Sequence, residues 1–159
     1  MKNIIILLML VSSVLNAQEN FTINIDVNIQ NVNSEDLEFK MFDFFNTEYT
    51  DVKSMANMYI GNSIYQYTKY GQSIFFSGDV SYIVKSYVKD DKIEFIFTNF
   101  KHKTIGGVGS GNFSFGLITN NELYSEKGMK HHNGAWQDLK IKLKDAMKIE
   151  VLKFEKIIK

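Results

Sequence analysis

The stretch VSYIVKSYVKDDKIEFIFTNFK, residues 80–101, decides the fold of this chain. It holds two β-rich runs joined by the dipeptide Asp90-Asp91. A connection this short predicts an antiparallel hairpin, because a parallel crossover needs a dozen or more residues. A two-residue turn also predicts the cross-strand pairs. They are Val88 with Ile93, Ser86 with Phe95 and Val84 with Phe97 on an apolar face, and Tyr87 with Glu94 and Lys85 with Ile96 on a mixed face.

The residues before the hairpin predict a strand, a helix and two more strands. Residues 21–29 alternate strictly between apolar and polar side chains, which is typical of a half-buried strand. A cap candidate at residues 33–34, followed by acidic residues, predicts a helix over 35–46. Residues 51–59 either continue this helix or form a second short one, which Gly61-Asn62 ends in both cases. The runs 63–69 and 73–77 are then predicted as strands.

The residues after the hairpin predict a loop and a closing helix. Residues 102–134 are rich in glycine and asparagine, which favours a long loop. From about Ala135, apolar residues recur at helical spacing with lysines between them. The element order is therefore β-α-β-β-β-β-α. This order predicts an α+β fold of two layers, in which both helices cover one face of an antiparallel sheet and leave the other face partly open.

The first residues predict export. Residues 1–17 read as a signal peptide, with a positive start at Lys2, an apolar run over 4–11 and cleavage between Ala17 and Gln18. The run is too short for a stable membrane anchor, because a spanning helix needs roughly twenty apolar residues. Residues 18–159 are expected to form one domain. We expect it in the periplasm or outside the cell of a Gram-negative-type bacterium.

Composition excludes several classes of function. The chain has no cysteine, so it holds neither a disulfide nor a thiolate metal site. Its formal net charge is zero, and all 18 basic residues are lysine. Proteins that bind nucleic acid are usually basic and use arginine to contact phosphate and guanine. Nucleic acid is therefore not an expected partner.

Four local patterns support a family resemblance. They are the helix start Ser34-Glu35-Asp36-Leu37, residues 71–78 around Ile74-Phe75-Phe76, the hairpin from Tyr82-Ile83-Val84 to residues 93–97, and the helix opened by Trp136. With them the chain resembles the domain-of-unknown-function 4468 family, exported envelope proteins with a fold like that of the TATA-binding protein. The resemblance implies that fold and an envelope location, and it supplies no activity. Residues 49–59 and the glycine-rich loop are long for such a domain.

No catalytic or cofactor-binding group is predicted. The glycine-rich run 106–111 lacks the flanking strand and helix of a phosphate loop, and Val108 stands where a serine-nucleophile elbow needs glycine. Asp90-Asp91 is better explained by the tight hairpin than by acid–base catalysis. Trp136 is interpreted as a core anchor. We expect no cofactor.

No metal site is predicted either. His131-His132, with His102, Glu122 and Glu126 nearby in sequence, offers nitrogen and oxygen ligands without any recognised spacing. We therefore interpret these residues as parts of a solvated loop.

The mixed face of the hairpin is the candidate binding surface. Its residues Lys85, Tyr87 and Ile96 combine aromatic and aliphatic groups with a charge, which suits a protein, peptide or glycan partner, or a homodimer. The leading hypothesis is an exported, non-catalytic envelope module. The alternative is a small-ligand carrier or weak hydrolase with a pocket under residues 102–134.

Overall fold

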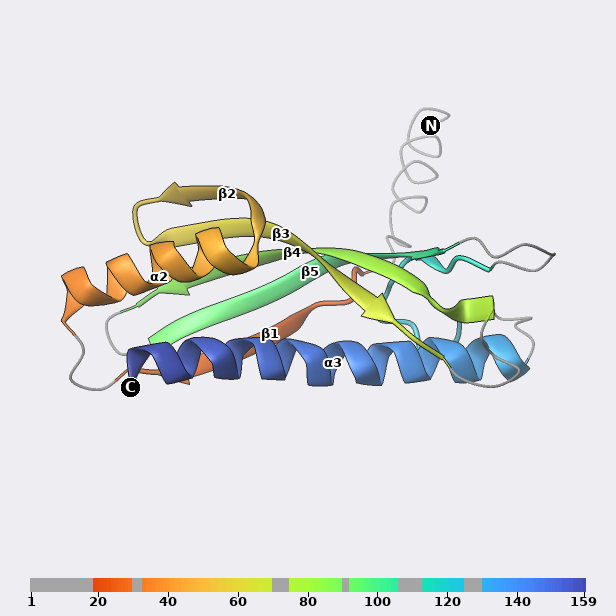
Figure 1. Cartoon of the computed structure of the whole chain (residues 1–159). Helices are drawn as coiled ribbons and strands as arrows, with labels where there is room; N and C mark the ends of the chain where they lie inside the picture. Colours follow the sequence, from red (N-terminus) through yellow and green to blue (C-terminus); the bar gives the residue numbers. More distant parts are fainter. Residues whose placement is uncertain (1–18, 30–32, 70–74, 90–91, 106–112, 125–129) are drawn as a thin grey trace, which may run out of the picture.

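The computed structural model describes residues 19–29, 33–69, 75–89, 92–105, 113–124 and 130–159, and it contains one six-stranded antiparallel sheet and two helices (Figure 1). The main strand order is β1-β5-β4-β3-β2, and β6 pairs with β5 beside β1. The layout is the predicted α+β arrangement. The elements are β1 (Ile23–Asn28), α2 (Ser34–Glu48), β2 (Thr50–Met55), β3 (Met58–Tyr67), β4 (Gly78–Val88), β5 (Lys92–Thr104), β6 (Gly116–Leu117) and α3 (Lys130–Ile158).

The β4–β5 hairpin has the predicted register. All five expected pairs are present, including Val88 opposite Ile93 and Lys85 opposite Ile96. Residues 90–91, where the turn was predicted, lie outside the described residues. The pairing continues beyond the predicted end of the second strand, because β5 extends to Thr104.

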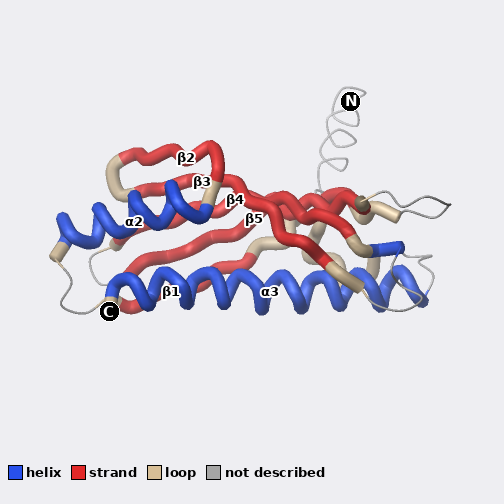
Figure 2. Tube along the Cα trace, in the orientation of Figure 1, coloured by secondary structure: helices blue, strands red, loops and turns tan. Residues whose placement is uncertain are grey.

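Both helices pack on the same face of the sheet. Phe95 on β5 contacts Phe44 of α2 and Phe154 of α3, with ring centroids 6.5 and 5.6 Å apart. The predicted helical stripes are buried: Leu37, Met41, Phe44 and Phe45 in α2, and Trp136, Leu139, Leu143, Met147, Val151 and Phe154 in α3. Figure 2 shows α3 running along the length of the sheet while α2 covers only one end of it. No helix in the described part of the chain is long and apolar enough to span a membrane.

The capping pattern at the start of α2 works as predicted. The side-chain oxygen of Asn33 accepts a hydrogen bond from the backbone N–H of Glu35 at 2.8 Å. This bond satisfies one of the free donors at a helix N-terminus. At the other end, the N–H of Tyr49 donates to the carbonyl of Phe45, and the chain then turns into an extended conformation.

The helical prediction for residues 51–59 is wrong. These residues form β2 and the start of β3, which pair as a hairpin at the edge of the sheet. Gly61 does not end an element but lies within β3. A Cβ at Gly61 would lie 2.6 Å from the Cβ of Tyr49, so glycine is required there by the close approach of the α2–β2 connection.

The prediction of a strand at residues 73–77 is also wrong. Phe75 and Phe76 lie in a short 3₁₀ turn, and residues 70–74 lie outside the described residues. The Phe76 ring stacks on Phe115, with centroids 5.5 Å apart and an interplanar angle of 10°. Phe76 is therefore packed in a turn rather than in a sheet, whereas Phe75 is 47% exposed.

The long loop predicted at 102–134 is shorter in the structure. His102 belongs to β5, Gly116 and Leu117 form β6, and α3 begins at Lys130 instead of about Ala135. The glycine-rich run 106–111 lies outside the described residues. Between these segments, the aromatic residues of 113–124 pack against the sheet and α3, so much of this region is folded.

Candidate functional site

The three residues predicted to bind a partner lie side by side on the open face, which we define as the sheet face opposite the helices. Lys85 on β4 is directly opposite Ile96 on β5, and Tyr87 follows Lys85 on the same face and is opposite Glu94. All three side chains are half-buried. Alternation explains their position, because their neighbours Val84, Phe95 and Phe97 are buried beneath the helices.

The corrected β2–β3 hairpin enlarges this surface. Ile60 on β3 pairs with Lys85, and Met58 pairs with Tyr87. On β2, Met55 pairs with Met58 and is 66% exposed. The sequence does not predict these apolar residues as part of the surface, because the pattern of residues 51–59 predicts a helix. Buried positions in β3, among them Tyr59, Gly61 and Tyr67, are separated by an odd number of less buried residues. This two-residue period is the signal that identifies β3 as a strand.

The charges on the open face are unevenly compensated. Asp26 pairs with Lys92 at 2.7 Å, and Glu94 pairs with Lys89 at 2.7 Å. By contrast, Lys53, Lys85 and Lys101 make no ion pair with any residue in the described part of the chain. The open face therefore combines apolar side chains with three lysines that make no ion pair within the described residues.

A bulge in β5 hollows the open face. The pairing of β4 with β5 shifts between Ser81 and Ile83, and Asn99 has the positive φ angle of 57°. An extra residue in one strand bends it and increases the local twist. The resulting hollow has a volume of about 320 Å³. It is lined by Thr50, Asn62, Ser63, Ile64, Ser81, Tyr82, Ile83, Asn99 and Lys101.

Trp136 is the core anchor that the sequence predicts. It is 2% exposed, and its indole Nε1–H donates to the carbonyl of Asn121 at 3.0 Å. Its ring packs against Phe115 and Tyr124, with centroids 5.4 and 5.5 Å away. These contacts fill the space between residues 113–124 and α3 with aromatic rings.

The histidines do not lie in a solvated loop. His102 is 2% exposed, and its Nδ1 accepts a hydrogen bond from the backbone N–H of Phe115 at 3.2 Å. Burial lowers the pKa of His102, which favours the neutral ring. His131 and His132 belong to the first turn of α3, and the His132 ring packs on Phe113.

Potential metal ligands are dispersed. Glu122 is exposed, and Glu126 lies outside the described residues. Within the part of the chain that the structure describes, no three histidine, aspartate or glutamate side chains form a group able to hold a metal ion.

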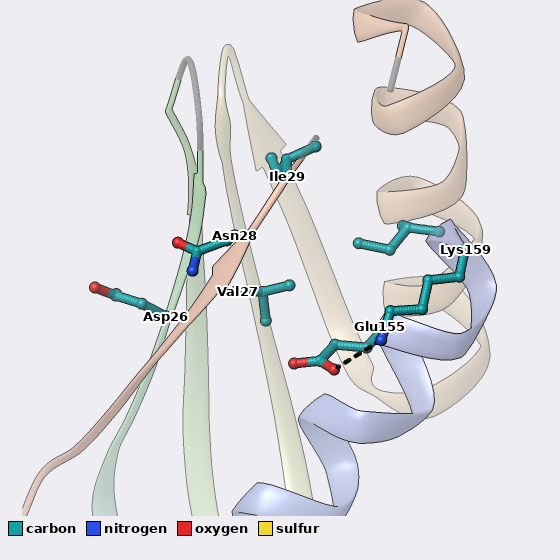
Figure 3. Close-up of a pocket in the computed structure, with 7 residues that line it drawn as sticks. Asp26, Val27, Asn28, Ile29, Glu155 and Lys159 are labelled. Atoms are coloured by element: carbon teal, nitrogen blue, oxygen red, sulfur yellow. Dashed lines mark ion pairs between the residues drawn. The ribbon is translucent and has the colours of Figure 1, made fainter. Parts of the chain in front are cut away.

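A second hollow, of about 380 Å³, lies where the end of β1 meets the end of α3 (Figure 3). Its polar groups do not converge on a ligand. Glu155 and Lys159 pair with each other at 3.7 Å, and Asp26 points away from α3. The hollow therefore offers no group of side chains that would orient a bound molecule.

Comparison with known proteins supports the fold. No family model and no curated protein matches this sequence. Two crystal structures do match. A TBP-like protein from Parabacteroides distasonis has a TM-score of 0.62 and 9% sequence identity, and the match covers 86% of this chain and 93% of that one. A DUF4468 family protein from Bacteroides ovatus has a TM-score of 0.57 and 9% identity, and the match covers 88% and 91%.

The two neighbours carry the two descriptions that the sequence resemblance implied. At 9% identity, the likeness concerns the fold and no activity. The chain has the TBP-like α+β fold, which a DUF4468 family protein shares.

Proposed function

We propose that this chain is an exported, non-catalytic envelope module that binds an acidic protein partner through the open face. The observation that carries the proposal is the combination of uncovered apolar side chains with uncompensated lysines around Lys85, Tyr87 and Ile96. Apolar contact supplies affinity, whereas charge complementarity supplies orientation and specificity. The proposed signal peptide, residues 1–17, would deliver the module to the compartment of its partner.

The shape of the open face favours a protein partner. The face is broad, and its apolar residues come from neighbouring strands in a continuous row: Met55, Met58 and Tyr87 lie on β2, β3 and β4. Protein–protein contacts place aromatic and methionine side chains at their centre and polar groups at the rim. Exposed methionine also adapts to varied partner shapes.

The test compares negative charges introduced on the two layers of the molecule. Lys85→Glu and Ile96→Asp change the open face, and Lys156→Glu makes a matched charge reversal on the exposed side of α3. Each full-length protein is used to recover partners from the envelope of its own cells. Any recovered partner is then purified, and its direct affinity is measured at low and high salt.

We expect both open-face variants to lose the direct interaction and Lys156→Glu to retain it. Binding should also weaken as salt is raised, because exposed charges are screened. Equal binding by all three variants, or binding that salt leaves unchanged, would contradict the proposal.

A further inference from the structure

A third hollow lies at the exposed edge of β3, between the sheet and the helices, and its side chains point to a small-molecule site. It has a volume of about 360 Å³ and lies among the end of α2, the middle of β3 and α3. It exists because α2 has 15 residues and α3 has 29, so the sheet beyond the end of α2 is covered by α3 alone (Figure 2). It is lined by Glu48, Ser63, Ile64, Tyr65, Tyr82, Ala146, Met147, Ile149, Glu150 and Lys153.

The carboxylate of Glu150 lies near two tyrosine hydroxyls, that of Tyr82 on β4 and that of Tyr49 in the connection between α2 and β2. Tyr82, which is 4% exposed, donates its hydroxyl hydrogen to Glu150 Oε2 at 2.7 Å. Tyr49 is 6% exposed, and its hydroxyl makes no well-aligned hydrogen bond within the described residues. That hydroxyl is nevertheless close enough to Glu150 for the carboxylate to raise the pKa of Tyr49, after the larger effect of burial.

The hollow contains more negative than positive charge. Lys153 lies 2.6 Å from Glu48, so the one lysine of the hollow pairs with the carboxylate of α2. Glu150 is left with hydroxyl donors and a second carboxylate nearby. Burial raises the pKa of Glu150, the hydroxyls of Tyr49 and Tyr82 and the charge of Lys153 lower it, and the charge of Glu48 raises it, with a net upward shift. A partly buried carboxylate in this position is stabilised by an additional cation.

The remaining walls are apolar. Ile64 and Ile149 are 63% and 61% exposed at the rim, and Met147 and Tyr65 line the interior. Exposed isoleucines beside a partly buried carboxylate fit a ligand with one charged end and an aliphatic chain. Tyrosine rings also attract cations at their faces.

We propose that this hollow binds a small organic ammonium ion, with the ammonium group against Glu150 and the aliphatic part over Ile64 and Ile149. A primary ammonium has three donors, which the Glu150 carboxylate, the Ser63 hydroxyl and the Tyr82 oxygen can accept. The hollow shares Ser63, Ile64 and Tyr82 with the lining of the open-face hollow, but Lys85, Tyr87 and Ile96 are not part of its lining.

The probe is hexylammonium, and hexan-1-ol and hexanoate are its matched controls. Calorimetry on the full chain should show binding of hexylammonium, with at least tenfold weaker binding of the alcohol and the carboxylate. In the same protein, nuclear magnetic resonance should place the largest shift changes at Ala146, Ile149 and Ser63. This second measurement needs no variant, so it remains decisive if a substitution prevents folding.

Two substitutions locate the charge. Glu150→Gln should weaken hexylammonium binding at least tenfold, because it removes the negative charge with little change of shape. Glu155→Gln is the matched control, since Glu155 lies on the same helix and pairs with Lys159 outside the hollow. Affinity in the unaltered chain should rise with pH as Glu150 ionises, while the ligand keeps its charge. The charged groups that face Glu150 in this range are Glu48 and Lys153, beside the hydroxyls of Tyr49 and Tyr82.

Comparable binding of the alcohol, unchanged affinity in Glu150→Gln, or shift changes confined to other parts of the chain would each overturn the proposal. The open-face variants Lys85→Glu and Ile96→Asp lie outside the lining of this hollow, so that experiment can fail or succeed without affecting these outcomes.

Discussion

The hydroxyl of Tyr67 donates a hydrogen bond to the carboxylate of Asp138 at 2.7 Å, and this contact joins the end of β3 to α3. Lys69 lies 3.0 Å from the same carboxylate oxygen, and Lys142 lies 3.5 Å from it. Lys142 also donates to the carbonyl of Thr68 and lies over the Tyr67 ring. The Asp138 carboxylate on α3 therefore holds the C-terminal end of β3 against the helix.

This carboxylate should make stability depend on pH. Burial acts to raise the pKa of Asp138, but the hydrogen bonds from Tyr67 and Lys69 and the charges of Lys69 and Lys142 outweigh it, so the pKa lies below its ordinary value of 3.8. The ionised group thus stabilises the fold above the unfolded pKa, and this contribution is lost as pH falls through the folded pKa. We expect urea titrations to show a decline below about pH 4. Asp138→Asn should be less stable at pH 7 and show a shallower decline.

The control for that experiment is Asp145→Asn. Asp145 is exposed, and its oxygen is 3.9 Å from Lys148, so the pair contributes little. Its substitution should leave the stability and the pH profile nearly unchanged. An acid decline that is identical in the Asp138→Asn variant would show that other groups control it.

Gly61→Ala should destabilise the fold. The new Cβ would lie 2.6 Å from the Cβ of Tyr49, closer than real contacts allow, so β3 or the start of β2 must move. We expect a loss of about 1–3 kcal/mol in the free energy of unfolding, measured by chemical denaturation. Gly134→Ala in α3 is the matched control, because its Cβ would meet nothing within 4 Å. That change should stabilise the protein by roughly 0.5–1 kcal/mol.

The two faces of β5 should respond differently to truncation. Phe95 is fully buried between both helices, so Phe95→Ala should cost about 3–5 kcal/mol. Its neighbour Ile96 is half-buried on the open face, and Ile96→Ala should cost about 1 kcal/mol or less. Similar losses at the two positions would mean that the open face is covered in solution, for example by a second copy of the chain.

Export can be tested at the predicted cleavage point. The protein recovered outside the cytoplasm should begin at Gln18, as measured by intact mass and N-terminal sequencing. Ala17→Leu places a large residue where signal peptidase requires a small one, and it should leave the uncleaved precursor associated with the membrane. A cytoplasmic protein that still begins with the original N-terminus would contradict the export proposal.

The sequence by itself determined the β4–β5 register and the buried stripes of both helices. The register follows because a two-residue connection leaves one way to align Val88 with Ile93, and the alternation then assigns every side chain to a face. The helices follow because Leu37, Met41 and Phe44, and the longer stripe from Trp136, recur at the helical period. Both signals lie within short stretches of sequence, so they can be recognised without knowing which segments pack together.

Only the tertiary structure decided what β2 and Gly61 do. β2 is an edge strand with mostly exposed side chains, so its residues carry no alternation between core and solvent. Gly61 has the appearance of a terminator in sequence, but it is needed because Tyr49 packs against its backbone. The same holds for Glu150 and Tyr82, which are 68 residues apart in sequence. Their contact exists because α3 packs across β4. A contact between residues so far apart in sequence depends on how the helix layer packs on the sheet, which no local pattern reveals.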